Sequence, residues 1–180
     1  MSDFENEITP GVERLVALLN ENGFLTNDSG DGVSNQELDM GCAMEGANVF
    51  LDLRGKTGQE SIVIIDQVYR LLLSKGVVFP EHGGHDSPMV GMSYDPSNAE
   101  KGSMGFILNL DDEMIWGADP ELPRKRLGYQ IRYCENWIAH PPIEKMVAAG
   151  EGPADVVIGI EHYEHLRETF AARLAAMDAR

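Results

Sequence analysis

The segment from Thr57 to Ser74 constrains the fold most, because it predicts a long helix that other parts of the chain must cover. Thr57 and Glu60 have the spacing of a capping box, and Gly76 stands where a C-terminal cap belongs. The apolar residues between these ends cover a wide face of the helix: Ile62, Ile64, Ile65, Val68, Tyr69, Leu71 and Leu72. A face of that width predicts a well-buried helix.

The elements expected on either side of this helix define a fold class. Thr9 and Pro10 open an earlier helix, which ends at Asn22 and Gly23. Strands are predicted for "GFLT" and "ANVFLDL", and a hairpin for "PMVGMSYD" and "SMGFILNL". The order α-β-β-α-β-β indicates an α+β domain over residues 1–112, with an antiparallel four-stranded sheet and two covering helices.

Residues 113–180 have a different character. "DDEMIWGADPELPRKRLG" contains turn signals and little periodicity, "YQIRY" is typical of a short strand, and "PPIEKMVAAG" predicts a short helix opened by proline. A longer helix is expected from about Asp155 to the end of the sequence. We therefore expect an irregular segment followed by a helical C-terminal arm or subdomain.

Charge limits the partners of the chain. Its 180 residues include 30 Asp and Glu against 14 Lys and Arg, a formal net charge of −16. That charge repels nucleic acid and anionic membranes and favours solubility or a basic protein partner. Cys42 and Cys134 are far apart, so two reduced thiols are expected. No signal peptide and no apolar run of membrane-spanning length is seen, which predicts a cytoplasmic protein.

The stretch "NDSGDGVSNQELD" has oxygen-bearing side chains at alternate positions. Asn27, Ser29, Asp31 and Asn35 occupy positions at which a calcium loop places ligands, in a spacing similar to the loops of dockerin modules. The first position lacks an acid, and the twelfth is Leu38. We expect an Asx-rich turn that enters a helix around residues 36–44 and needs no calcium.

"GFLTNDSGDG" followed by "GCAMEGANVFLDL", a helix and a hairpin resembles small uncharacterised proteins encoded by bacteriophages. The resemblance covers about the first 110 residues. It implies a phage accessory or virion protein, located in the host cytoplasm or in the virion, and it brings no activity and no assigned catalytic residues.

"EHGGHD" is the better candidate for binding a divalent metal. His82 and His85 are separated by two glycines, and Asp86 follows them. Imidazole and carboxylate ligands suit zinc and other transition metals. The alternative is a solvated loop before the hairpin, and no nucleophile or general base accompanies the motif.

The expected C-terminal helix carries an apolar stripe at helical spacing: Tyr163, Leu166, Phe170, Leu174 and Met177. Such a stripe has to pack on the first domain, on a second copy of the chain or on another protein. Self-association is favoured among these, because symmetric dimers are the commonest oligomers. Trp116 and Trp137 are expected in the core, and either would be a binding anchor if exposed.

Three functions remain open from the sequence. The first is a small acidic phage-type accessory or assembly protein that acts by binding a protein. The second is a metal-dependent enzyme or ligand-binding protein that uses the "EHGGHD" loop. The third is an acidic DNA mimic that inhibits a nucleic-acid-binding host protein.

Overall fold

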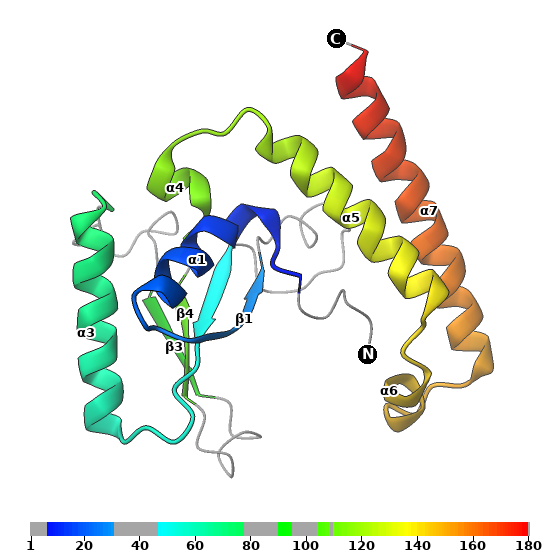
Figure 1. The fold of residues 1–180 in the computed structure, drawn as a ribbon. Coiled ribbons are helices and arrows are strands. Elements are labelled where there is room, and N and C mark those ends of the chain that lie inside the picture. The colour runs from blue at the N-terminus through cyan, green and yellow to red at the C-terminus, as the bar shows by residue number, and fades with distance from the viewer. Residues whose placement is uncertain (1–6, 31–46, 78–89, 95–103, 109, 180) are drawn as a thin grey trace. The chain divides into compact units, whose positions relative to one another are not determined.

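The structure, a computed structural model, describes residues 7–30, 47–77, 90–94, 104–108 and 110–179 (Figure 1). These residues form two compact units. The described residues of Ile8–Asp119 contain the strands and four helices, and we call this unit the α/β unit. Residues 120–179, together with Glu7, contain only helices in the described part and form the helical unit. Whether residues 113–180 behave as a separate domain, as the sequence suggested, stays a prediction.

The α/β unit begins with a short 3-10 helix and ends with a short α-helix. Its elements in chain order are η2 (Pro10–Val12), α1 (Glu13–Glu21), β1 (Thr26–Gly30), β2 (Asn48–Leu51), α3 (Gly58–Ser74), β3 (Val90–Tyr94), β4 (Met104–Leu108) and α4 (Asp112–Trp116). The helix expected around residues 36–44 lies outside the described residues.

The expected fold class is wrong, because the described residues are mostly helical and the fold is not built on a sheet with two covering helices. Its β-structure consists of two antiparallel pairs, β1 with β2 and β3 with β4, in the order β1-β2-β4-β3. In the described strands these pairs meet at one register position, where Phe50 lies opposite Ile107. The sheet is therefore a minor element, and most of the described residues lie in helices.

The core of the α/β unit is shared by its helices and strands. Its members are buried and apolar: Val12, Leu15, Val16, Leu19, Ala47, Val49, Leu51, Leu53, Val68, Leu72, Val77, Leu108 and Leu110. Helix α3 contributes Val68 and Leu72, with Ile64 and Ile65 partly buried beside them. The predicted capping box is confirmed, since Thr57 accepts from the backbone of Glu60 and the Glu60 carboxylate accepts from Thr57 N at 2.7 Å. Gly76 has a φ of 83°, as the predicted helix end requires.

Helix α1 receives its N-terminal cap from a distant part of the chain. Thr9 was expected to cap this region, but its side chain makes no capping hydrogen bond. The buried carboxylate of Asp112 accepts from the backbone N–H groups of Arg14 and Leu15, each at 2.9 Å. The first turn of a helix leaves such donors unsatisfied, so Asp112 supplies what the local sequence does not.

The helical unit consists of α5 (Leu122–Ala139), α6 (Ile143–Ala148) and α7 (Pro153–Asp178). The strand expected for "YQIRY" is wrong, because residues 122–139 form one helix. The segment expected to be irregular before it is helical over Asp112–Trp116 and from Leu122 on, with residues 117–121 between the two helices. Tyr129, Ile131 and Tyr133 alternate as a strand would, while Tyr129, Tyr133 and Trp137 also recur at helical spacing. Packing of α5 along α7 selects the helical alternative (Figure 1).

None of the helices in the described ranges combines the length and the apolar character needed to cross a bilayer.

Candidate functional site

The two predicted metal sites fall mainly outside the described residues. His82, His85 and Asp86 are not described, nor are Asp31 and Asn35. Asn27 and Ser29 lie in β1, where Ser29 is paired with Val49 of β2. Within the described ranges no group of three or more His, Cys, Asp or Glu side chains is placed to hold a metal ion. Metal binding by the "EHGGHD" loop stays a prediction.

The predicted apolar stripe of α7 lies along α5 in the same chain. Leu166 and Phe170 are buried, with 9% and 2% of their surface exposed, and Tyr163, Leu174 and Met177 are half-buried. We call this contact between α5 and α7 the α5–α7 seam. The seam is closed at one end by an ion pair between Arg124 and Asp178. The stripe is thus covered within its own chain.

Aromatic rings pack closely in the α5–α7 seam. Trp137 is stacked on Tyr163 with their ring centroids 4.3 Å apart, and the Tyr133 ring lies 6.0 Å from that of Tyr163. Gly159 lies against Trp137 so closely that an added Cβ atom would be 2.5 Å from the Trp137 Cη2 atom. The absence of a side chain at position 159 therefore permits this close approach.

Burial in the seam changes the acidity of two groups. It raises the pKa of the Cys134 thiol from its ordinary 9.0 to about 11, and the positive charge of Arg167 opposes this in part. Burial also raises the pKa of Tyr163, and the neighbouring Tyr133 adds to the effect. Both groups hold their protons at neutral pH, so Cys134 is a packed thiol and a poor nucleophile.

The two tryptophans are half-buried and engaged within the chain. Trp116 packs against the core of the α/β unit, and the Arg14 guanidinium lies 4.5 Å from the centre of its ring. Trp137 is engaged in the seam. The core packing expected from the sequence describes both residues better than a role as exposed anchors.

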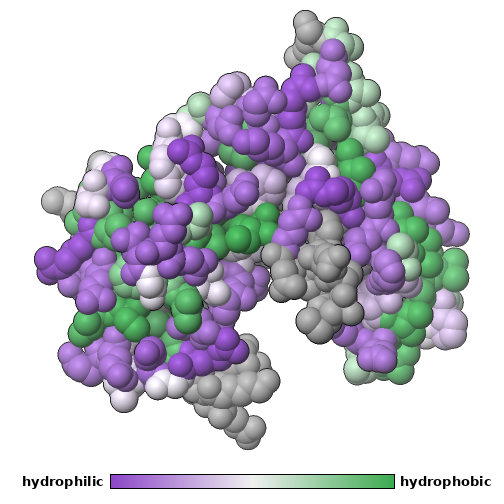
Figure 2. All heavy atoms as spheres, in the orientation of Figure 1, coloured by the Kyte–Doolittle hydropathy of each residue, from purple (hydrophilic) through white to green (hydrophobic). Residues whose placement is uncertain are grey.

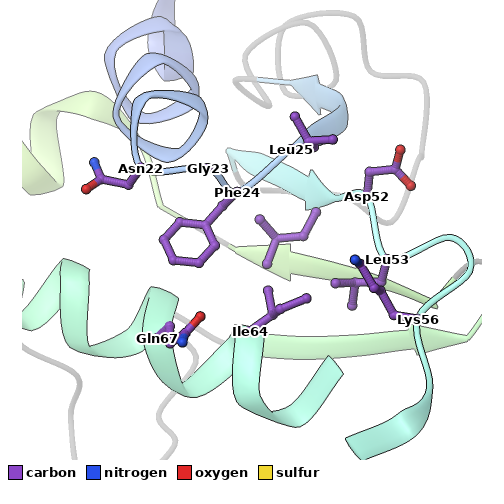
Figure 3. Close-up of a pocket in the computed structure, with 10 residues that line it drawn as sticks. Asn22, Gly23, Phe24, Leu25, Asp52, Leu53, Lys56, Ile64 and Gln67 are labelled. Carbon is purple, nitrogen blue, oxygen red and sulfur yellow. The ribbon is translucent and has the colours of Figure 1, made fainter. Parts of the chain in front are cut away.

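A cleft of about 350 Å³ opens in the α/β unit between the turn after α1, the end of β2 and α3 (Figure 3). The Phe24 ring points into it, above Ile64, and Leu51 and Leu53 also line it. Lys56 and Asp52 lie at its rim. Arg54 donates a side-chain hydrogen bond to Asp52, which lowers the pKa of that carboxyl. The lining of the cleft mixes apolar and polar side chains, and its carboxylate is already paired.

The most exposed apolar side chains of the helical unit lie at the α6–α7 end. Val157 and Ile158 of α7 are 54% and 63% exposed, and Ile143 and Val147 of α6 are 51% and 62% exposed. A turn over residues 149–152 joins the two helices, so both pairs lie at the same end of the unit. We call these four residues the α6–α7 apolar surface. Figure 2 shows apolar side chains gathered over the half of α7 nearest to α6.

Helical geometry explains why Val157 and Ile158 are exposed. The run "VVIGI" (156–160) is apolar on every side of its helix, whereas the seam covers only the side on which Gly159 and Tyr163 lie. An apolar run that surrounds a helix indicates burial on more than one side. This signal is present in the sequence, beside the longer stripe of Tyr163, Leu166, Phe170, Leu174 and Met177.

Acidic residues surround the α6–α7 apolar surface. Between residues 143 and 168 the sequence has Lys145 and Arg167 as its basic residues, against six acids: Glu144, Glu151, Asp155, Glu161, Glu164 and Glu168. All six acids are exposed, while Arg167 is half-buried near Cys134. The surface is therefore an apolar patch in a negative field.

The chain matches no protein-family model, no curated protein and no solved structure.

Proposed function

We propose that this chain acts by binding another protein, as a small accessory or assembly protein of the bacteriophage type. The α6–α7 apolar surface is the docking surface in this proposal. The supporting observation is the exposure of Val157 and Ile158, 54% and 63%, on the part of α7 that the seam leaves uncovered.

Burial energetics support a docking role for this surface. Covering one large aliphatic side chain stabilises a complex by about 1.5–3 kcal/mol. Single exposed apolar residues are common on proteins, but adjacent ones within an acidic rim resemble the apolar centre and polar rim of an interface. Val157 and Ile158, with Ile143 and Val147 at the same end of the unit, provide such a centre.

A photo-crosslinking experiment tests this function. A photoreactive amino acid is placed at position 158 and, in a control chain, at position 62 of α3. Ile62 is a suitable control because it is 62% exposed, almost the same as Ile158, and belongs to the other unit. The chain is produced in the cells that normally make it, including infected cells, and illuminated.

We expect a discrete crosslinked product from position 158 and none, or a much weaker one, from position 62. Mass spectrometry then identifies the partner. If position 158 yields no product, or if both positions yield the same products, the α6–α7 apolar surface is not a docking surface and the proposal fails.

A further inference from the structure

We infer that the partner segment bound by the α6–α7 apolar surface is a basic amphipathic helix. This inference rests on the proposed function, since it names the class of partner for the same surface. It is carried by the arrangement of charge along the outer face of α7.

Apolar and acidic residues follow one another along a single line of α7. Val157 is followed by Glu161, Glu164 and Glu168 at spacings of four, three and four residues, which places them on one side of the helix. All four are exposed, and Ile158 widens the apolar end of the line. The surface therefore begins with two aliphatic side chains and continues as a row of carboxylates.

These carboxylates are not neutralised by ion pairs in the described part of the chain. No ion pair is formed there by Glu161, Glu164 or Glu168, whereas Asp66 on α3 is paired with Arg70 at 2.7 Å. Three carboxylates at adjacent turns repel one another, so a cationic partner is favoured by charge and is attracted from solution. The strength of this attraction falls as salt is added.

A second copy of the chain fits this surface less well. In a symmetric dimer the same patch is used by both copies. The outer face of α7 offers aliphatic side chains, carboxylates and two histidines, His162 and His165, so the α7 of a second copy brings no lysine or arginine to the carboxylates. The α6 of that copy would bring one exposed lysine, Lys145, against six acids. A helix with apolar residues followed by lysines or arginines on one face can contact both the aliphatic side chains and the carboxylates of α7. Docking of an amphipathic helix through one face is a recognised mode of peptide binding.

The test uses a synthetic probe of defined chemistry. It is a fluorescent 18-residue alanine-based helical peptide with two leucines near one end, followed by three lysines on the same face at spacings of four, three and four. One control peptide has the same composition with its lysines on the opposite face. Another has glutamates in place of lysines. Binding to the full chain is measured by fluorescence anisotropy at two salt concentrations.

We expect the basic same-face peptide to bind and both controls to bind at least tenfold more weakly. The V157S/I158S variant should lose at least tenfold in affinity. E161Q/E164Q/E168Q should lose affinity and most of its salt dependence. The I62S variant should bind as the unaltered chain does, since its serine replaces an equally exposed isoleucine elsewhere. Circular dichroism establishes that each variant is folded.

Three outcomes would overturn the inference. Equal binding of the same-face and opposite-face peptides would mean adventitious attraction to an acidic protein. Binding unaffected by V157S/I158S would place the contact elsewhere. A dimer in analytical ultracentrifugation that V157S/I158S converts to a monomer would make a second copy the occupant. If position 158 crosslinks a cellular protein while the basic peptide fails to bind, the docking function stands and only the partner class is wrong.

Discussion

Helices α3 and α7 both leave large apolar side chains in solvent, yet their surroundings differ. Ile62 on α3 and Ile158 on α7 are almost equally exposed, at 62% and 63%. On α3, Arg70 pairs with Asp66, and Glu60 is used in the capping box. On α7, the three glutamates in line form no ion pair within the described residues. Exposure of apolar side chains therefore does not distinguish the two helices, whereas the pairing of their charges does.

The inner faces of the two helices provide the largest expected effect. Replacing Phe170 by alanine removes a ring that is 2% exposed from the seam, which should cost about 3–5 kcal/mol of unfolding free energy. The equivalent change on α3, L72A, should cost about 2–5 kcal/mol. Urea unfolding measures both losses. The F170A variant is followed by Trp137 fluorescence in a W116F background, and the L72A variant by Trp116 fluorescence in a W137F background. A loss below 1 kcal/mol for F170A would mean that the seam is not a core.

Thiol chemistry sharpens the description of the seam. With its pKa at about 11 instead of 9.0, Cys134 should react roughly a hundredfold more slowly with iodoacetamide at pH 8 than an ordinary thiol. The folded chain retains this proton while the unfolded chain loses it, so stability should fall as the pH rises from about 9 to about 11. A C42S background restricts labelling to Cys134. Rapid labelling of the folded protein would contradict the burial of this side chain.

Two glycine substitutions compare the helices directly. G159A on α7 forces a methyl group against Trp137 and should cost about 1–3 kcal/mol, despite the better helix propensity of alanine. G58A on α3 meets nothing within 4 Å and should be neutral or stabilise by up to about 1 kcal/mol. Thermal unfolding monitored by circular dichroism measures both. Equal effects of the two substitutions would rule out the close contact of Gly159 with Trp137.

The N-terminal caps of the helices provide a smaller contrast. T57A removes the capping side chain of α3 and should cost about 1 kcal/mol. Helix α7 has only half of a capping box, since Gly152 N donates to Asp155 at 2.7 Å and glycine has no side chain to return the bond. G152S should therefore stabilise by a few tenths of a kcal/mol, because residue 152 already has extended backbone. The denaturation midpoints of the two variants should therefore shift in opposite directions, lower for T57A and higher for G152S.

The outer faces should show the smallest effect on stability. I158S and I62S replace side chains that are mostly in water, so each should change the unfolding free energy by less than about 0.5 kcal/mol. The two variants should nevertheless differ in peptide binding. A large loss of stability in I158S alone would mean that Ile158 is part of the fold and is not free to bind a partner.

Local signals in the sequence predicted the structure better than distant ones. The capping box of Thr57 and Glu60, the end of α3 at Gly76 and the short helix α6 depend on neighbouring residues, and the structure contains them. The sequence of α5 gave a wrong prediction. The spacing of Tyr129, Ile131 and Tyr133 matches the period of a strand, and the spacing of Tyr129 and Tyr133 also matches the period of a helix. Only packing with α7 decides between these periods.

The wrong assignment of residues 129–133 to a strand also changes what the apolar stripe on α7 suggests about function. Once residues 129–133 are assigned to a strand, the stripe containing Leu166 and Phe170 has no partner and suggests an interface. The structure provides that partner as α5, and the exposed apolar residues are then Val157 and Ile158. The short apolar run of residues 156–160, which surrounds the helix, therefore indicates the exposed apolar side chains better than the longer stripe from Tyr163 to Met177 does.

The cap that Asp112 provides for α1 has a consequence for the order of events during synthesis. Its carboxylate binds the N–H groups of Arg14 and Leu15, which precede it by 98 and 97 residues. A ribosome makes about 5–20 residues per second, so α1 is complete several seconds before its cap exists. During that interval its first turn can be satisfied only by water or by a chaperone. A nascent chain stalled before residue 112 should therefore expose an N-terminal segment that proteases cleave, and one stalled after Asp112 has left the tunnel should protect it.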